Sequence, residues 1–368
     1  QAWAENGTPT ESSGWKKGVR HGALETWWPD GRPRVRANHR NGLQVGASAE
    51  WYANGLQKEA STWTQGARNG AATSWDETGR VRQQGAWTMG VRDGAWIETD
   101  EKGRVTEGTY VAGRKAGRWT EWSDAGEQER GAYVDNQRHG AWEIARADGK
   151  PVARGPYTFG KRNGTWTELY PDGKKRREGP YVDDAADGVW TTWRPNGSRE
   201  TEVTWARGKM SGPWIGYAPA GTKVLEGQTR DGAMIGAWSR FHANGNLAER
   251  GTFRGGEPGF GPLEKRGTRT GKWETFHENG KPAVVGQLDG EGRMTGRWTW
   301  HDDTGAEVRA EAWKDGRKVE PRVADAAPAE KPGGATAGPA QPAAGAKAPP
   351  TGGAGGKGAA KGKGPAKK

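Results

Sequence analysis

Apolar and polar residues alternate in short segments along this chain, and glycines interrupt the alternation at regular intervals. A unit of about 24 residues opens with a glycine, continues in most units with Trp two positions later, and then reaches a turn that ends in another glycine. The segments between turns are about 6 to 9 residues long, which is strand length. The opening glycines are Gly22, Gly46, Gly70, Gly94, Gly117, Gly140, Gly164, Gly188, Gly212, Gly236, Gly271 and Gly296. The pattern predicts one supersecondary unit repeated in a row.

Two turns are expected in each unit. The first ends in a glycine nine residues after the opening one, as in Asn-Gly at Gly55 and Asp-Gly at Gly31, and such dipeptides are strong hairpin signals. The second is expected at segments such as Gly66–Gly70 and Gly160–Gly164. Two strands per unit predict an all-β fold, an elongated single-layer antiparallel meander of about 12–13 tandem β-hairpins over residues 1–320, with a partial first repeat at 1–21.

Aromatic residues recur at two positions of the unit. Because only 32% of the chain is hydrophobic, an ordinary globular core is not expected, and rings in matching positions should bury one another as a ladder. We expect rings of the same column to stack between successive hairpins. The predicted ladder consists of Trp96, Trp119, Trp142, Trp166, Trp190, Trp214, Trp238, Trp273 and Trp298, with Tyr110, Tyr133, Tyr157 and Tyr181 in the second column. Thr229 and Leu288 replace the second-column aromatic in two units.

Units such as Asp172-Gly-Lys-Lys-Arg-Arg-Glu-Gly-Pro-Tyr181 and Asn244-Gly-Asn-Leu-Ala-Glu-Arg-Gly-Thr-Phe253 resemble MORN repeats. The order of turn, Gly-x-Trp strand and turn over residues 160–173 is similar to the MORN variant of bacterial YwqK-like proteins. The resemblance covers about residues 1–316 and implies a scaffold, with dimerisation and lipid contact also associated with such arrays. The label attached to YwqK-like proteins implies an antitoxin role.

Composition changes abruptly near Pro321. Residues 321–368 are almost all Ala, Pro, Gly and Lys, carry +6 of the formal net charge of +11, and are predicted to be a disordered basic tail. This tail is interpreted as a solubilising spacer, with an electrostatic arm for anionic lipid or an envelope polymer as the alternative. The chain starts with Gln and within a repeat, which suits either a removed signal segment, and hence an exported or cell-envelope protein, or a cut within a longer cytoplasmic array.

Two sets of residues are candidates for contact with a partner. Basic residues of the second turn, namely Arg68, Arg92, Lys115, Arg138 and Arg162, would line one edge if the units align. An insertion of 11 residues falls within 255–270, where Phe260 and Leu263 offer apolar contacts. Insertions in repeat arrays often lie on the binding face, although a degenerate half-repeat is the favoured explanation of this one. The sheet edges near Trp3 and Trp313 are a candidate surface for homodimerisation.

Catalytic chemistry has little support in the sequence. The chain has no Cys, its six His show no metal-ligand spacing, and neither a nucleophile elbow nor a phosphate loop occurs, so we expect no enzyme activity and no cofactor. Nucleic-acid binding is disfavoured because the rings are needed for the ladder. The predicted function is a non-enzymatic protein-interaction scaffold, and the rival is a binder of anionic lipid or envelope glycan through basic turns, exposed aromatics and the tail.

Overall fold

The computed structural model describes residues 1–5, 7–260, 262–263 and 266–320, and the elements that it contains there are strands. The predicted tail at 321–368 lies outside the described residues. The strands are β1 (Ala2–Trp3), β2 (Pro9–Lys16), β3 (Val19–Trp27), β4 (Pro33–Arg40), β5 (Leu43–Trp51), β6 (Gln57–Thr64), β7 (Ala67–Trp75), β8 (Val81–Thr88), β9 (Val91–Thr99), β10 (Val105–Val111), β11 (Arg114–Trp122), β12 (Gln128–Val134), β13 (Gln137–Ala145), β14 (Pro151–Thr158), β15 (Lys161–Arg162), β16 (Gly164–Leu169), β17 (Lys175–Val182), β18 (Ala185–Ala186), β19 (Gly188–Trp193), β20 (Arg199–Ala206), β21 (Lys209–Tyr217), β22 (Lys223–Arg230), β23 (Ala233–Phe241), β24 (Leu247–Arg254), β25 (Arg269–Phe276), β26 (Pro282–Leu288), β27 (Met294–His301), β28 (Glu307–Lys314) and β29 (Arg317–Val319).

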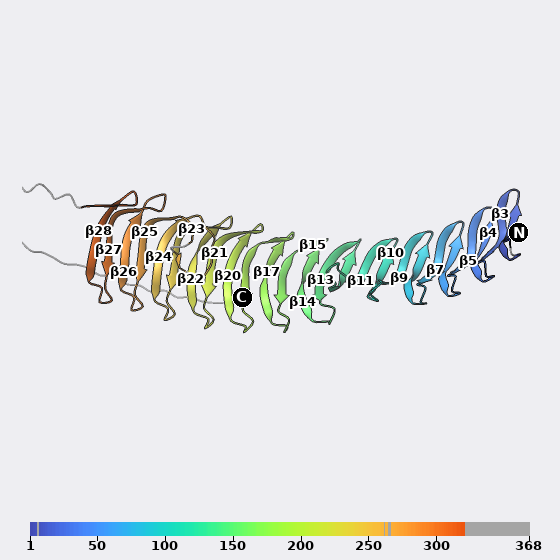
Figure 1. The fold of residues 1–368 in the computed structure, drawn as a ribbon, viewed down its shortest axis with the longest axis horizontal. Coiled ribbons are helices and arrows are strands. Elements are labelled where there is room, and N and C mark those ends of the chain that lie inside the picture. The colour runs from blue at the N-terminus through green and yellow to red at the C-terminus, as the bar shows by residue number, and fades with distance from the viewer. Residues whose placement is uncertain (6, 261, 264–265, 321–368) are drawn as a thin grey trace, which may run out of the picture. The chain divides into compact units, whose positions relative to one another are not determined.

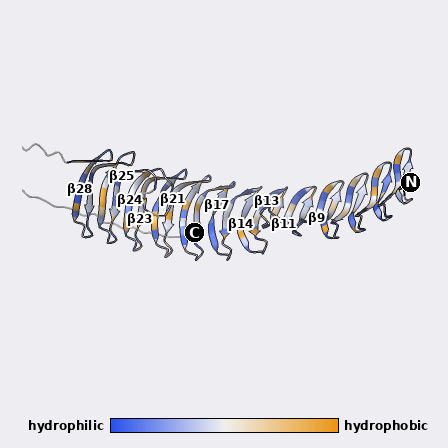
Figure 2. Cartoon of the chain, in the orientation of Figure 1, coloured by the Kyte–Doolittle hydropathy of each residue, from blue (hydrophilic) through white to orange (hydrophobic). Residues whose placement is uncertain are grey.

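Residues 1–320 form one open antiparallel sheet of 29 strands. Neighbouring strands follow one another along the chain, as β9, β10, β11 and β12 do, so the sheet is a meander (Figure 1). Apolar and hydrophilic stretches alternate along the whole row of strands (Figure 2), as expected for a single layer with water on both sides. The predicted all-β, single-layer meander is confirmed.

The first turn of each unit has the geometry that its sequence predicts. In the turn after β7, the Gly79 amide donates to the Asp76 carbonyl at 2.9 Å, and the Asp76 amide donates to the Arg80 carbonyl at 2.9 Å. Gly79 has a φ of 84°, a left-handed conformation that closes a three-residue hairpin loop after a type I turn. The Asp76 carboxylate also accepts from the Thr78 and Arg80 amides, each at 3.0 Å. The side chain therefore reinforces the turn that it opens.

The second turn lies earlier than the sequence suggested. After β6 the two central residues are Gln65 and Gly66, with φ values of 51° and 81°, as a type I′ hairpin turn requires. The predicted segment Gly66–Gly70 therefore belongs mainly to β7, and the turn consists of only two residues. The sequence was misleading because Gly70, the glycine at the end of that segment, is not part of a turn. It lies inside the strand, where the register shifts between Ser61 and Trp63 of the paired strand.

In eight units a Trp ring lies over a glycine at this break in the register, whereas β6 and β7 have Ser61 and Ala72 there. Between β10 and β11, Glu107 pairs with Thr120 and Thr109 pairs with Ala116, so β11 has extra residues at this bulge. A Cβ added to Gly108 would lie 2.1 Å from Cδ2 of Trp119, which means that the ring occupies the space above this glycine. The same arrangement recurs for Gly85, Gly131, Gly155, Gly179, Gly227, Gly251 and Gly286. The bulge and the glycine together let a large ring lie flat on a single-layer sheet.

The rings of the two aromatic columns alternate along the array. From Trp87 to Trp166, successive rings contact each other edge to face, with centroids 4.9–6.1 Å apart and interplanar angles of 77–89°. We expected rings to stack within a column, and the structure instead interleaves Trp and Tyr from both columns. T-shaped contact places the positive edge of one ring on the negative face of the next, which is favoured over direct stacking. We call this arrangement the aromatic ladder and its side of the sheet the ladder face.

The ladder becomes a more ordinary core toward residue 300. Here aliphatic residues join the rings in one buried cluster of Val203, Trp214, Leu225, Met234, Trp238, Phe253, Leu263, Trp273, Leu288 and Trp298. Thr229 and Leu288, which replace the column aromatic, are both 3% exposed. The Thr229 hydroxyl donates to the Gly212 carbonyl at 3.0 Å. Both replacements are therefore accommodated without exposing the ladder.

Candidate interaction surfaces

The five basic residues expected in the second turns lie instead in strands, on the ladder face. Most have their charge matched at short range, as Arg68 does with Glu59 at 2.6 Å and Arg92 with Glu98 at 2.7 Å. They also lie over rings, and the Arg92 guanidinium is 4.3 Å from the Trp96 centroid. Lys115 and Arg138 form similar pairs with Glu121 and Glu129, whereas Arg162 pairs with Asp184 in the turn between β17 and β18. Their side chains are only 26–35% exposed, so the array itself uses much of this charge.

The most connected of these networks is centred on Glu121. Its carboxylate accepts from Lys115 at 2.6 Å, from the Tyr133 hydroxyl at 2.5 Å and from Arg138 at 2.9 Å. Burial opposes ionisation of Glu121, but these hydrogen bonds and the two cations hold its pKa below the ordinary value. Burial and the hydrogen bond to Glu121 raise the pKa of the Tyr133 hydroxyl. The network joins β11, β12 and β13, and it stabilises the stacking of successive repeats.

Phe260 and Leu263 of the insertion pack on the ladder face of β21–β24. Leu263 is fully buried, and its amide donates to Oε2 of Glu249 at 3.1 Å. The same oxygen accepts from Nε of Arg240 at 2.9 Å. Leu263, expected as a contact for a partner, is therefore part of the protein's own core, because the inserted segment is long enough to cover apolar rows that a two-residue turn would leave open.

Phe260, the other candidate of the insertion, is 40% exposed. Its ring contacts Trp214 with centroids 5.8 Å apart, and the Arg194 guanidinium lies 5.8 Å from it. A Cβ on Gly216 would lie 2.8 Å from Phe260 Cε1, so this glycine makes room for the ring. A hollow of about 350 Å³ adjoins Phe260 between the insertion and the sheet. Phe260 thus combines an anchoring contact with an exposed edge.

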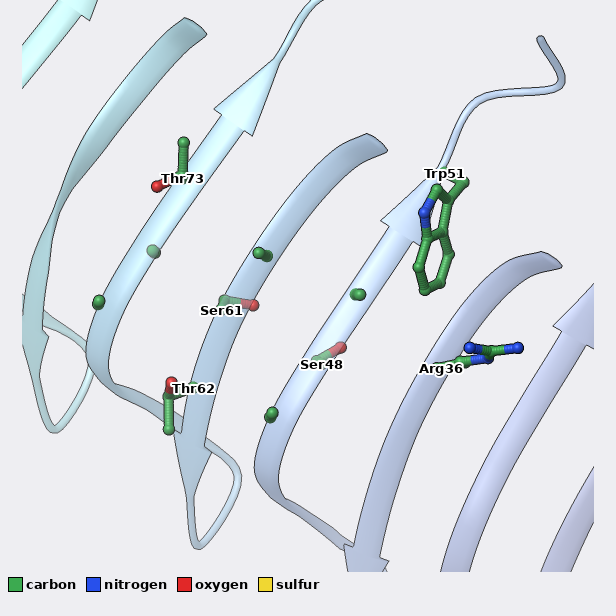
Figure 3. Close-up of a pocket in the computed structure, with 11 residues that line it drawn as sticks. Arg36, Ser48, Trp51, Ser61, Thr62 and Thr73 are labelled. Carbon is green, nitrogen blue, oxygen red and sulfur yellow. The ribbon is translucent and has the colours of Figure 1, made fainter. Parts of the chain in front are cut away.

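The opposite face of the sheet carries two grooves at the level of the bulges. One, of about 420 Å³, crosses β4–β7, and Figure 3 shows Ser48, Ser61 and Thr73 on neighbouring strands, with Arg36 and Trp51 nearby. These first units have Leu24, Ser48 and Ala72 where later units have the ladder Trp. On the groove side of the sheet the lining side chains Ala47, Ala49, Ala60 and Ala71 are also small, and they leave the surface hollow.

The second groove, of about 980 Å³, crosses β11–β16 and is called the central groove below. Its lining includes three arginines from three strands, Arg118, Arg130 and Arg154, together with Glu143. Its floor contains small residues of the opposite face, Ala132, Ala141 and Pro156, next to the glycines that lie beneath the Trp rings. The sequence reasoning missed these arginines, although Arg130 and Arg154 are one repeat apart and occupy equivalent strand positions.

Among the described residues, no group of three or more His, Asp or Glu side chains is arranged to hold a metal ion. The same part of the chain has no helix of the length and apolarity that a membrane span requires. The charged groups that do cluster are ion pairs along the ladder and across the turns. The arrangement is suited to presenting a surface.

Comparison with known proteins identifies the repeat. The family model described as "MORN repeat variant" matches residues 162–183, 234–254 and 269–288. No match was found among curated proteins. A crystal structure of a protein of unknown function from Bacteroides caccae is 11% identical, with 84% of this chain and 96% of that chain covered and a TM-score of 0.15. The Tc holotoxin pore of Photorhabdus luminescens is also 11% identical, with 84% of this chain but only 20% of that chain covered and a TM-score of 0.14. Scores this low carry no argument about fold or function, whereas the family model shows that the chain contains MORN-variant repeats at the three matched segments.

Proposed function

We propose that this protein is a non-enzymatic scaffold that binds a protein partner across the face of its repeat array. The observation that carries this proposal is a difference between the two faces of the sheet: one is occupied by contacts between repeats and the other is open. On the ladder face, rings and charges are bonded to one another from repeat to repeat, as around Glu121. On the opposite face, two grooves cross several strands each and are open. A surface of this kind, continued over many repeats, suits recognition of an extended partner.

The rival function, binding of anionic lipid or envelope glycan, relied on the exposed aromatics, on the tail and on basic turns that form an exposed stripe. The pairing of Arg68, Arg92 and Lys115 with carboxylates weakens that premise, because matched charges attract a polyanion less strongly. The antitoxin role implied by the family resemblance is the finer form of the proposed function. It requires that the captured partner be a toxin whose activity falls when this protein binds it.

The test is a pull-down from a lysate of the organism that encodes the chain. The bait is the full chain and, in parallel, the chain ending at residue 320, each at low and at high salt. Capture of one saturable protein partner that survives both high salt and removal of 321–368 is the expected result. Recovery of lipid, glycan or nucleic acid alone, lost at high salt or without the tail, would refute the scaffold.

A further inference from the structure

The arginines of the central groove differ from most other basic residues of the array. Across the described residues, Arg118, Arg130 and Arg154 lie within ion-pair distance of no carboxylate and over no ring, and all three are exposed. Those of the ladder are paired, as Arg138 is with Glu121. Glu143 lies among them in the groove and Arg154 also interacts electrostatically with Glu178, so the three guanidinium groups are compensated only in part and the hollow keeps an excess of positive charge.

The register of the sheet fixes the order of these charges. Thr120 pairs with Arg130, Arg130 with Glu143, Glu143 with Arg154, and Arg154 with Thr167. A straight row of side chains therefore crosses five strands, with one carboxylate between two guanidinium groups. Because neighbouring strands lie about 4.8 Å apart, the backbones at Arg130 and Arg154 are about 10 Å apart. A segment in the extended polyproline II conformation advances about 3.1 Å per residue with three residues per turn, so two acidic residues separated by two others lie on the same side of it, about 9 Å apart, and match this interval.

We propose that the central groove binds an extended acidic segment of a partner protein, with its carboxylates on Arg130 and Arg154. Arg118 lies at the neighbouring strand and receives a third anionic group, while Glu143 accepts a hydrogen bond from a donor between the two acidic residues. The inference rests on the proposed scaffold function and names the chemistry of the partner. It also explains why the row is not uniformly basic: the central carboxylate selects acidic residues that are spaced apart.

Other occupants fit the groove less well. Single-stranded nucleic acid needs rings on which bases stack, but Trp119 and Trp142 are 3% and 2% exposed and their indole N–H groups donate to carbonyl oxygens at 3.2 and 3.1 Å. A continuous polyanion would also be repelled by Glu143. The chain's own segment 321–368 has a net charge of +6 and would be repelled by the arginines. In a second copy, the Glu178, Glu202 and Glu226 carboxylates of equivalent position are already paired with Lys175, Arg199 and Lys223.

The experiment measures binding of fluorescent peptides to the full chain by fluorescence anisotropy. The probe contains Glu-Ser-Ser-Glu flanked by glycine and serine, and its control has Gln in place of both Glu. The test variant is Arg130→Gln with Arg154→Gln. The matched control is Arg40→Gln with Arg230→Gln, since these two arginines are also exposed strand residues, removed from the groove.

The wild-type chain is expected to bind the Glu probe about tenfold more tightly than the Gln probe, because the Gln probe lacks both charge pairs. The test variant should lose about tenfold in affinity, the effect of two exposed charge pairs of at most about 1 kcal/mol each, whereas the control variant should bind as the wild type does. The reversed variant Arg130→Glu with Arg154→Glu should bind the peptide in which Lys replaces Glu. Circular dichroism checks that all the variants keep the strand content of the wild type.

Several outcomes would overturn the inference. These are no binding of the Glu probe by the wild type, equal binding by the test and control variants, or stronger groove-dependent binding of oligothymidine or of phosphatidylglycerol vesicles. If the pull-down partner is retained by the Arg130→Gln, Arg154→Gln variant, the scaffold function stands and only this inference fails. If no partner is captured by any variant, the scaffold function itself fails.

Discussion

The substitution Gly131→Ala tests whether the glycines beneath the ladder rings are structural. A Cβ at this position would lie 2.2 Å from Cδ2 and 2.3 Å from Cε2 of Trp142, so the indole must leave its site. That ring is 2% exposed, its Nε1 donates to the Ala132 carbonyl at 3.1 Å, and its centroid is 5.2 Å from that of Tyr133. The whole set of contacts depends on one missing methyl group.

The magnitude follows from the burial of the indole. A Trp side chain buries about 150–250 Å², and at about 25 cal/mol per Å² its exposure costs about 4–6 kcal/mol as an upper estimate. Loss of the indole hydrogen bond adds about 1 kcal/mol. Partial repacking recovers some of this free energy, so we expect Gly131→Ala to lower the local stability by about 3–5 kcal/mol, like removal of a buried Trp.

The assay is a double-mutant cycle of Gly131→Ala and Trp142→Ala. The stability of each of the four proteins is measured by urea unfolding and by hydrogen exchange of the β12–β14 amides. Hydrogen exchange is needed because a repeat array can open locally. With Trp142 already truncated, Gly131→Ala should be neutral or stabilise the strand by roughly 0.5 kcal/mol, because Ala is favoured over Gly within a strand. Equal destabilisation in both backgrounds would show that the ring does not explain the glycine.

Three further predictions concern other parts of the array. Leu263→Ala should lower the stability by about 2–5 kcal/mol, as for a fully buried Leu, whereas Phe260→Ala should cost less because its ring is 40% exposed; thermal melts compare them, and equal losses would contradict the docking of the insertion. Because the pKa of Glu121 is lowered in the folded chain, its ionisation stabilises the fold above the unfolded pKa of about 4.3, and this stabilisation is lost as the pH falls through the folded value. Glu121→Gln should therefore make urea stability less dependent on pH below about 4, and an unchanged acid profile would exclude this network as its source. Gly79→Ala should lower the free energy of unfolding by about 1 kcal/mol or slightly more, because the φ of Gly79 is 84° and Ala is strained there. Hydrogen exchange of the β7 and β8 amides should become faster, and unchanged exchange would contradict the strain.

The repeat unit and its strands could be predicted because both depend on local sequence. Asp-Gly and Asn-Gly dipeptides require a tight turn wherever they occur, and the alternation between them determines which residues share a face. The second turn was misplaced because two glycines four residues apart look alike in the sequence. One adopts positive φ in a turn at Gly66, and the other adopts it within a bulge at Gly70.

The candidate site was predicted less well. Arg68, Arg92 and Lys115 were recognised as a recurring set, but their placement on the ladder face depends on the bulge that follows them. Leu263 was expected to meet a partner, yet it is buried because the insertion crosses strands that lie up to two repeats away along the sheet. Contacts between repeats of this kind leave no periodic signal within one repeat.

By itself, the sequence of this protein determined the fold class, the length of the repeat, the first turns and the rings that form the ladder. These features follow from backbone preferences and from side-chain spacing within about 24 residues. Only the tertiary structure decided which charges are matched and which are free. Arg138 and Arg154 look alike in the sequence, but one reaches a carboxylate two strands away and the other faces an open groove. The distinction arises because ion pairing depends on the distance between strands and on the face that each residue occupies, and the register and the bulges set both.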